Sequence, residues 1–554
     1  MKAESIAERV LKIHPDDNVL VALVPLRAGE QIADSAGTFT LVSDVPPKHK
    51  VTTRDLAAGA PIVMYGIPVG RARKPIAAGE PITTLNTRHD SMAVKPRTAS
   101  SPWVAPEVGR WRKKRWSGYY REDGQVGTRN YWIVIPLVFC ENRNIDTMRQ
   151  AFVEELGFAP PQKYRAMVKR LVQLYQEGHS GRIVGSQVQE TLESSSSSSV
   201  FPNVDGIKFL THQGGCGGTR DDARTLCGLL AGYIHHPNVA GATVLSLGCQ
   251  NAQTEILREE LAKRDPRTGK QVLVLEQQRL GTESKLLSQA IEETFLGLVG
   301  ANEAQRTSAS LTSLTVGLKC GGSDGFSGIS ANPTLGQVSD KLAAMGGRTI
   351  LSEFPELCGV EQELVNRCIS DEAADRFLSL MTAYNSRAQA VGSGFDMNPS
   401  PGNIRDGLVT DAMKSAGAAR KGGASPITAV LDYPEYATQS GLNLLCTPGN
   451  DVEAVTAQVG SGANIVLFTT GLGTPTGNPI APVIKISSNT ALAQRMPDII
   501  DFDCGPIISG QSTAEESSEA LLDLMLRVAS GQVKTKAERL DQDDFIPWKR
   551  GVSL

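Results

Sequence analysis

A fifteen-residue stretch in the second half of the chain combines several residue types that can do chemistry. Residues 319–333 contain a thiol (Cys320), a carboxylate (Asp324), an amide (Asn332) and four glycines. Glycines at this density let the backbone approach a ligand closely, with N–H groups pointing inward. The apolar run 313–318 predicts a buried strand that leads into this loop, and ligands of α/β sheets bind at the carboxyl ends of strands. The alternative is a Gly/Ser turn with a buried structural cysteine.

Two more cysteines occupy the same kind of position. Cys216 and Cys249 each follow an apolar run and lie beside glycine, as Cys320 does. If the three strands share one parallel sheet, the thiols converge at its carboxyl edge. Three thiolates with an open position suit iron, as a mononuclear centre or as a cluster with one unligated iron, and also zinc. The alternative is three small buried apolar residues.

Histidines provide candidate proton carriers. His212 precedes Cys216 by four residues and is a candidate ligand or base. His14 and His49 lie near the N-terminus, beside charged or amide residues, and they reach the same site only if the N-terminal region folds over it as a lid. A lone histidine is usually structural, so this alternative stays open for each. The sequence contains no P-loop, HExxH motif or strand-linked GxGxxG, which leaves kinase, metalloprotease and nicotinamide dehydrogenase functions unsupported.

The elements that must position these residues change in character along the chain. Residues up to about 90 repeat an apolar–x–Ala–Gly–x–x–Ile frame at 26–32, 56–62 and 76–82, which predicts short strands in a small all-β module. From Gly118 onward, apolar strands, glycine loops and helical patterns alternate, which indicates α/β domains with largely parallel sheets. We expect a β domain over 1–92, a linker over 93–117, a middle α/β domain over 118–262 and a C-terminal α/β catalytic domain over 263–554.

Composition restricts the function classes. The 554 residues suffice for roughly three or four domains. A net charge of −3 gives no electrostatic footprint for nucleic acid or an anionic membrane. No apolar run is long enough to span a bilayer, and the charged N-terminus lacks a signal-peptide core, so we expect a cytoplasmic protein. Nine cysteines without a CxxC pair are expected to be thiols in a reducing compartment.

Several motifs together resemble the altronate/galactarate dehydratase family. The N-terminal stretches 14–19, 48–51 and 65–70 are similar to the β-clip SAF domain of that family, and 118–130 is similar to the start of its middle domain. The C-terminal matches are Cys320–Asp324, Asn332-Pro333, Pro399–Asn403, Thr447–Asn450, Phe468–Pro475 and Asp501–Gly505. The Pro-Ser-Pro-Gly-Asn and Asp-Phe-Asp elements are more similar to the altronate branch.

The resemblance implies an iron- or manganese-dependent hydro-lyase that dehydrates a hexonate, foremost D-altronate, to a 2-keto-3-deoxy acid. Such a reaction needs a base for the C2 proton, a cation for the aci-carboxylate and an acid for the C3 hydroxyl. We expect Fe²⁺ at Cys216, Cys249 and Cys320, with Mn²⁺ or an iron–sulfur cluster as alternatives. The candidate base is His212, then Lys319 or Glu353, with His14 and His49 if a lid closes. The expected substrate-binding residues are Ser323, Asp324, Asn332, Asn403, Asn450, Thr470, Gly471 and Gly473.

Two departures from the family pattern affect the substrate. Leu472 stands where the resemblance leads us to expect arginine, and Ile404-Arg405-Asp406 replaces a Lys-x-Gly element. The alternatives are therefore a galactarate-type dehydratase, a C–S lyase acting on a sulfonated hydroxy acid, and a sugar-acid sensor without turnover. The expected partner is a small-molecule sugar acid, or a sulfonated hydroxy acid for the lyase, with no nucleic acid or membrane, and a homodimer is the expected assembly.

Overall fold

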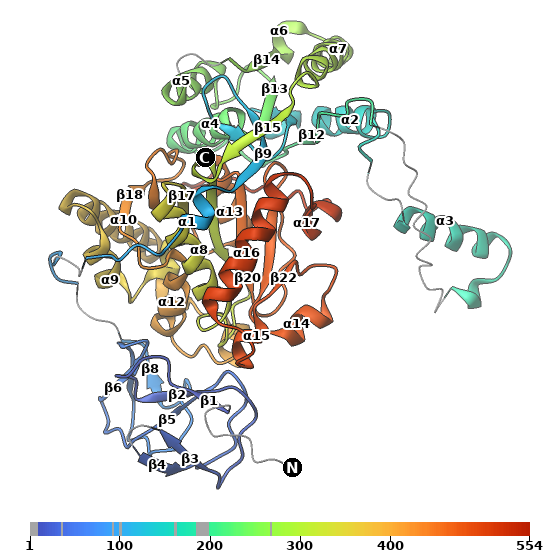
Figure 1. The fold of residues 1–554 in the computed structure, drawn as a ribbon. Helices are drawn as coiled ribbons and strands as arrows, with labels where there is room; N and C mark the ends of the chain where they lie inside the picture. Colours follow the sequence, from blue (N-terminus) through green and yellow to red (C-terminus); the bar gives the residue numbers. More distant parts are fainter. Residues whose placement is uncertain are drawn as a thin grey trace.

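The computed structural model describes residues 9–34, 37–90, 94–98, 102–159, 163–183, 199–265 and 269–554 (Figure 1). Parts of the predicted first domain (1–8, 35–36 and 91–92) and of the predicted linker (93 and 99–101) lie outside these ranges. In Figure 1 an N-terminal β module, a large C-terminal domain and a middle domain follow one another from the bottom to the top. Among the described residues, no helix combines the length and the apolar character that a membrane span requires.

The N-terminal module is built from short antiparallel strands, as the repeated frame predicts. Its glycines Gly29, Gly59 and Gly79 all have φ near +80°, so each repeat places a glycine where the backbone turns into the left-handed region. Isolated bridges join Leu26 to Val45 and Leu56 to Ile76. The strands are β1 (Val10–Leu11), β2 (Val19–Ala22) and β5 (Lys50–Thr52) in one sheet, β3 (Gln31–Asp34) and β4 (Gly37–Thr40) in a second, and β6 (Pro61–Met64), β7 (Ile67–Ala72) and β8 (Thr87–Arg88) in a third.

The middle domain contains a four-stranded parallel sheet in the order β12-β11-β13-β14. Its central strand β11 is buried at every position, as expected for a strand covered on both faces. The strand β14 and the helix α7 follow the boundary predicted at residue 262 and pack with this sheet, so the middle domain extends to Ala301. The elements are β11 (Tyr131–Pro136), β12 (Gly206–Phe209), β13 (Val239–Ser246), β14 (Gln271–Glu276), α2 (Asn142–Val153), α3 (Lys163–Gln176), α4 (Arg220–His235), α5 (Thr254–Arg264), α6 (Gln277–Leu280) and α7 (Glu283–Ala301).

A small antiparallel sheet in the order β10-β9-β15 joins the middle and C-terminal domains. It consists of β9 (Arg115–Tyr120), β10 (Val126–Gly127) and β15 (Arg306–Ser310). The predicted linker therefore ends inside a sheet, and its tryptophans Trp111, in α1 (Gly109–Arg112), and Trp116 are buried. The Trp111 indole donates to the Glu519 carboxylate, 3.0 Å away, so the basic segment between these tryptophans is anchored to the C-terminal domain.

The C-terminal domain is organised by a seven-stranded, fully parallel sheet in the order β18-β19-β17-β16-β20-β21-β22. Helices α8 and α16 pack together on one side of it, and α13 contacts β16 and the middle-domain helix α4. The strands are β16 (Thr315–Cys320), β17 (Arg348–Leu351), β18 (Ile427–Leu431), β19 (Gly441–Leu445), β20 (Ile465–Thr470), β21 (Val483–Ser487) and β22 (Phe502–Asp503). The helices are α8 (Ala331–Met345), α9 (Glu361–Arg367), α10 (Asp371–Ala390), α11 (Pro401–Arg405), α12 (Asp411–Ala419), α13 (Asp451–Gly460), α14 (Thr490–Arg495), α15 (Gly505–Ile508), α16 (Ala514–Ala529) and α17 (Lys536–Arg539).

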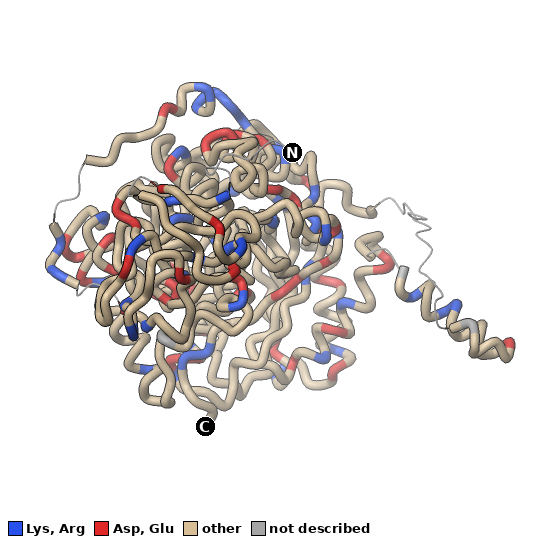
Figure 2. Tube along the Cα trace, turned by 90° about the horizontal axis from the view of Figure 1, so that it is seen from below, with Lys and Arg blue, Asp and Glu red and all other residues tan. Residues whose placement is uncertain are grey.

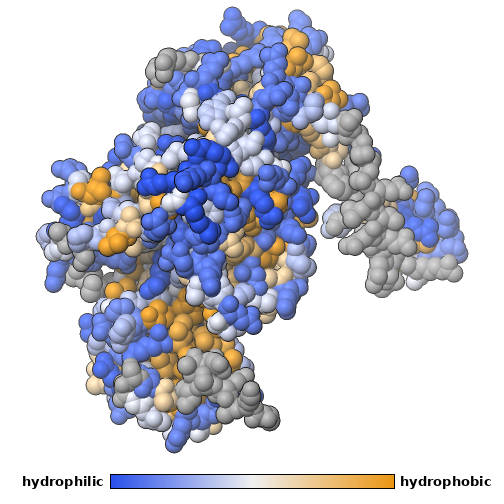
Figure 3. Space-filling model, in the orientation of Figure 1, coloured by the Kyte–Doolittle hydropathy of each residue, from blue (hydrophilic) through white to orange (hydrophobic). Residues whose placement is uncertain are grey.

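The other two domains contact opposite ends of this sheet. Asn464, just before β20, donates through Nδ2 to the Val126 carbonyl and accepts at its own carbonyl from Thr128 Oγ1, so the middle domain lies at the amino ends of the strands. The β module lies at their carboxyl ends, where Lys48 Nζ is 3.0 Å from Asp324 Oδ2. Acidic and basic residues are interspersed along the trace (Figure 2), in line with the small net charge. Figure 3 shows an apolar area over α7, where Phe295, Leu296 and Val299 are exposed.

Candidate active site

A buried network of lysines and carboxylates lies at the carboxyl ends of β16, β17 and β19. Lys319, the penultimate residue of β16, is fully buried, and its ammonium contacts the Glu353 carboxylate and lies 2.7 Å from Asp451 Oδ1. Asp451 begins α13 in the loop after β19. The parallel register of β16, β17 and β19 brings these groups together, because Lys319 lies at the end of β16, and Glu353 and Asp451 follow the ends of β17 and β19.

Cys320 and Glu353 are bridged by a second buried lysine. Lys421 Nζ lies 2.8 Å from Cys320 Sγ and 3.3 Å from Glu353 Oε2. Glu353 has φ +72°, a conformation that is uncommon outside glycine, and its N–H is held by Thr447 Oγ1. Strained backbone conformations cluster at functional sites, and the Glu353 carboxylate is therefore a functional candidate.

A third carboxylate and a third lysine complete the network. Glu356 Oε2 accepts from Cys320 Sγ at 3.3 Å, and Glu356 Oε1 lies 2.7 Å from Lys414 Nζ. Three ammonium groups thus face three carboxylates and one thiol, and among these groups only Asp451 has a substantially exposed side chain. Such a balanced set stabilises its members mutually, whereas the loss of one leaves a buried charge without a partner.

The pKa values of Glu353 and Glu356 are shifted in opposite directions. Burial, with Glu356 nearby, raises the pKa of Glu353 above its ordinary value, against the opposing effect of Lys319 and Lys421. Burial also opposes the charge on Glu356, but Lys414 and the other lysines outweigh it and lower that pKa to about 2. Burial likewise disfavours the ammonium form of Lys319, yet the carboxylates of Glu353 and Asp451 raise its pKa. Glu356 is therefore a fixed anion, Lys319 a fixed cation and Glu353 the group best suited to exchange a proton.

The donor atoms of Cys320, Glu353 and Glu356 lie within 4.8 Å of one another, as those of a metal site do. The neighbouring ammonium groups already fill the places of a cation, since Lys421 contacts the thiol and Lys414 and Lys319 contact the carboxylates. This donor set therefore does not fit a divalent metal in the observed arrangement.

Asp324 connects the C-terminal domain to the β module. Its Oδ1 accepts from the N–H and Oγ of Ser327, both at 2.9 Å, and from Ser488 Oγ at 2.8 Å. Its Oδ2 pairs with Lys48, which also lies 2.8 Å from Asp406 Oδ1. Since the Asp324 side chain is fully buried and its oxygens already have several partners, it serves first as an anchor for Lys48.

Two lysines of the module were not singled out from the sequence. Besides Lys48, Lys50 Nζ donates to the Gly407 carbonyl at 2.6 Å, and burial lowers the pKa of Lys50 to about 7. His49 lies between them, half-buried, with its pKa lowered by burial, and its Nδ1 lies 3.2 Å from the Pro47 carbonyl. His14 accepts from the Asp16 N–H and packs under Gly66. The module is thus packed on the C-terminal domain, with His49 at the junction.

Most predicted substrate residues surround the network but are engaged in structural contacts. Asn403 Nδ2 donates to the Ser323 carbonyl, and Asn332 is held between Thr469 and the Gly417 carbonyl. Asn450 caps α13. Thr470 Oγ1 accepts from the Gly473 N–H, and a Cβ on Gly471 would meet the Asp324 carboxyl carbon at 2.3 Å. Their observed role is to shape the loops.

The predicted thiolate triad does not form. Cys320 is buried at the end of β16, whereas Cys216 and Cys249 are exposed and follow β12 and β13 in the middle domain. The expectation failed because β16 belongs to a different sheet. His212 is also in the middle domain. Its Nδ1 accepts from the Gly214 N–H, so its Nε2 donates to the Pro136 carbonyl, and burial lowers its pKa to about 4. With both nitrogens engaged, His212 is a structural histidine.

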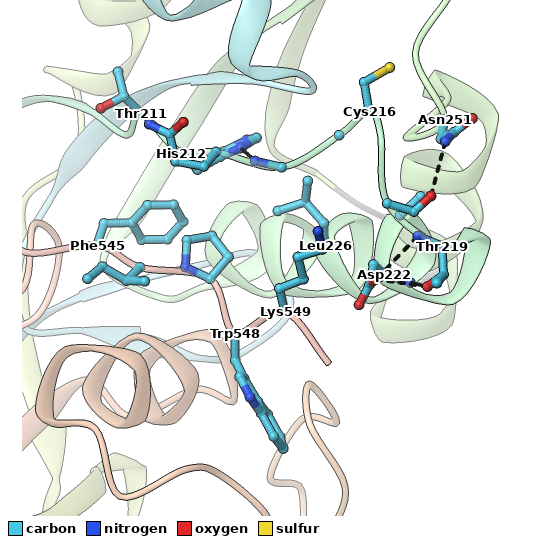
Figure 4. A pocket seen from close by; sticks show the side chains of 17 residues that line it. Thr211, His212, Cys216, Thr219, Asp222, Leu226, Asn251, Phe545, Trp548 and Lys549 are labelled. Atoms are coloured by element: carbon cyan, nitrogen blue, oxygen red, sulfur yellow. Dashed lines mark hydrogen bonds between the residues drawn. The ribbon is translucent and has the colours of Figure 1, made fainter. Parts of the chain in front are cut away.

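A separate cavity of about 300 Å³ lies beside His212, between the loop 211–219, α4 and the C-terminal segment 545–549 (Figure 4). Phe545, Leu226 and Trp548 contribute apolar surface, and Asp222 is engaged with Thr219 at the start of α4. The Cys216 thiol points away from this cavity in Figure 4. The cavity therefore offers space without the proton-transfer groups gathered around Lys319.

The other residues missed from the sequence are Lys414, Lys421, Glu356 and Asp451. Lys421 lies in a Gly/Ala-rich segment, Ala416–Gly423, where a fully buried charge has no local explanation. The adjacent charges Arg420 and Lys421 within this small-residue segment were the one available signal. Its partner Cys320 is 101 residues away in the chain, so nothing in the sequence indicated that the two side chains pair.

Comparisons with known proteins agree with this three-part organisation. Residues 8–90 match the altronate/galactarate dehydratase SAF domain, 118–302 the D-galactarate dehydratase/altronate hydrolase second domain, and 311–553 the D-galactarate/altronate dehydratase C-terminal domain. Altronate dehydratases of Bacillus subtilis and Escherichia coli are each 33% identical over 98% of this chain and 99% of their own. Galactarate dehydratase (L-threo-forming) of Escherichia coli is 29% identical over 96% of this chain and 94% of its own. The chain belongs to the altronate/galactarate dehydratase family of hydro-lyases.

Proposed function

We propose that this enzyme removes water from a six-carbon sugar acid of the altronate type to give a 2-keto-3-deoxy acid, and that the reaction takes place at the lysine–carboxylate network. The observation that carries the proposal is the pairing of one carboxyl group of raised pKa, Glu353, with two buried ammonium groups, Lys319 and Lys421. The 33% identity to altronate dehydratases, against 29% to the galactarate enzyme, favours a hexonate over a hexarate.

The first step is removal of the C2 proton, which is acidified by the neighbouring carboxylate of the substrate. Glu353 as a carboxylate accepts this proton, and its raised pKa makes it a stronger base than an exposed glutamate. The electrons of the C2–H bond move toward C1 and create an aci-carboxylate dianion. The ammonium groups of Lys319 and Lys421 supply the positive charge that stabilises it, in a region without competing water.

The second step is loss of the C3 hydroxyl. Protonated Glu353 returns its proton to the departing oxygen, the C3–O bond breaks and the C2–C3 double bond forms. The resulting enol ketonises to the 2-keto acid. Glu356 stays ionised throughout, because Lys414 holds its pKa down, and its charge keeps Lys421 protonated. One carboxyl group thus serves as base and then as acid.

The departures from the family pattern bear on which acid binds. Asp406, within the replaced Lys-x-Gly element, pairs with Lys48, and Leu472 donates its N–H to the Gly322 carbonyl. A Leu472→Arg variant tests the specificity, since an added guanidinium favours a substrate with a second carboxylate. We expect its ratio of kcat/KM for galactarate over altronate to rise at least tenfold.

The experiment is 2-keto acid formation from a panel of aldonates and aldarates that includes altronate and galactarate. It uses the wild type and Glu353→Gln, with Glu363→Gln as a control because Glu363 is half-exposed on α9 and pairs only loosely with Arg367. We expect turnover of altronate that falls at least 100-fold in Glu353→Gln and is unchanged in Glu363→Gln. Product from no acid in the panel, or full activity of Glu353→Gln, contradicts the proposal.

A further inference from the structure

Three exposed thiols gather at the carboxyl edge of the middle-domain sheet. The neighbouring parallel strands β12, β11 and β13 are each followed by a cysteine: Cys216, Cys140 and Cys249. Since parallel neighbours end at the same edge, the three loops leave the sheet side by side. The third thiol of this edge is therefore Cys140, which the spacing of Gly-Cys pairs did not reveal.

Backbone contacts hold the three loops against one another. The N–H of Phe139, next to Cys140, donates to the Gly214 carbonyl at 3.1 Å. The Ala252 N–H, in the loop of Cys249, donates to the Gly215 carbonyl at 3.0 Å. The loop of Cys216 thus lies between the other two and is bonded to both.

Gly215 makes this approach possible. Its φ is +99°, and a Cβ there would stand 2.1 Å from the Leu137 carbonyl oxygen, at the end of β11. Any side chain would therefore push the Cys216 loop away from the Cys140 turn. Asn142, two residues beyond Cys140, adds a further tie by donating to the His212 carbonyl at 2.9 Å.

Exposure distinguishes these thiols from the other cysteines. Cys140, Cys216 and Cys249 are exposed, whereas five of the remaining six are buried and Cys358 is intermediate. Burial raises the pKa of thiols such as Cys227 and Cys446 to about 12, which keeps them protonated. The three exposed thiols are accessible to a ligand from solvent. Gln278 Nε2 already donates to Cys249 Sγ at 3.3 Å, the type of N–H···S contact that stabilises a metal-bound thiolate.

Three thiols on three adjacent loops suit a cluster, because each thiol can bind a different iron. Thiolates that bind one tetrahedral ion at ~2.3 Å must approach one another to about 4 Å. Among the described residues, the groups whose ligand atoms lie within 4.8 Å of one another do not include this trio. A cubane cluster holds its cysteine sulfurs farther apart, because each binds a different iron, and it tolerates one iron without a cysteine.

We propose that Cys140, Cys216 and Cys249 bind a [4Fe–4S] cluster whose fourth iron has no cysteine ligand. Each thiol loses one proton and forms one S–Fe bond. Equal amounts of ferrous and ferric iron with sulfide supply the oxidised cluster, so its assembly needs no added oxidant. The site is separate from the Lys319 network, on a different sheet, and it does not depend on the proposed reaction.

The test is anaerobic reconstitution of the full chain with ferrous iron, ferric iron and sulfide, followed by iron and acid-labile sulfide analysis and electron paramagnetic resonance after reduction. We expect about four irons and about four sulfides per chain in the wild type. Cys140→Ser, Cys216→Ser and Cys249→Ser should each lose most of both. Cys320→Ser and Cys368→Ser are the controls and should keep both. Cys368 is a matched control because its thiol donates to the Leu364 carbonyl, which a serine hydroxyl can also do.

A second measurement does not depend on whether the variants fold. Alkylation of the native wild type, mapped by mass spectrometry, should label Cys140, Cys216 and Cys249 in the metal-free protein and leave all three protected after reconstitution. Zinc bound without labile sulfide, equal labelling before and after reconstitution, or iron loss confined to Cys320→Ser each overturns the proposal.

Discussion

Replacing Lys319 by methionine removes the central cation of the buried network. In this variant the fully buried Glu353 carboxylate keeps the 3.3 Å ion pair with Lys421 but loses the one with Lys319. Asp451 also loses its ion pair with Lys319. Breaking a buried pair by removing one partner costs ~3–5 kcal/mol. Because Lys421 remains and Asp451 is partly exposed, we expect about 3 kcal/mol of lost stability. We also expect at least a 100-fold loss of kcat, since an ammonium group facing the dianion is removed.

The matched control is Lys341→Met. Lys341 is equally buried, but its partners Glu515 and Glu519 are partly exposed and can turn to water. Its loss should cost about 1 kcal/mol and leave kcat unchanged. Urea unfolding followed by tryptophan fluorescence gives the difference in stability. Adding Glu353→Gln to Lys319→Met should recover part of the loss, because the unpaired charge disappears. Equal destabilisation by the two lysine variants, or a further loss in the double variant, refutes the reasoning.

Three further predictions follow from the network and the domain junction. Lys414 and the other lysines lower the Glu356 pKa to about 2 from 4.5. Glu356 therefore stabilises the fold above pH 4.5, and this stabilisation is lost as the pH falls toward 2. In acid unfolding, the free energy of unfolding of Glu356→Gln should fall less steeply over that range than that of the wild type. Burial lowers the Lys50 pKa to about 7 from 10.5, so between these pH values the unfolded chain binds more protons than the folded chain. The free energy of unfolding therefore rises with pH in this range. The urea midpoint of Lys50→Met should rise less with pH than that of the wild type. Gly471→Ala should lose ~1–3 kcal/mol in thermal unfolding, because its Cβ meets the fixed Asp324 carboxylate, whereas Gly300→Ala, with open space in α7, should gain up to about 1 kcal/mol.

The local elements could be predicted from the sequence because each carries its own signal. The apolar runs at 131–139, 206–210 and 463–468 became β11, β12 and β20, with ends shifted by a few residues. The family and the three-part α/β organisation with a SAF domain were confirmed as well. The fifteen-residue loop after β16 was correctly placed at the carboxyl edge of a parallel sheet.

The assignment of strands to sheets had no such signal. Cys216, Cys249 and Cys320 share a local pattern of strand, glycine and thiol, and this pattern is the same in two sheets. Burial decides their chemistry, and it depends on what packs above each loop. For the same reason His212 could be read as a base, although the neighbouring Gly214 N–H and Pro136 carbonyl occupy both nitrogens.

The junction with the β module shows how two domains are fitted to each other. Gly325 and Gly407 both face the Lys48 carbonyl, where a Cβ would approach to 2.4 and 2.3 Å, so side chains are absent from the two positions that the module covers. Lys48 itself has φ +75°, which turns its ammonium toward Asp324 and Asp406. The β module is therefore fitted to the C-terminal domain through Lys48 and Lys50, which contact Asp324, Asp406 and the Gly407 carbonyl.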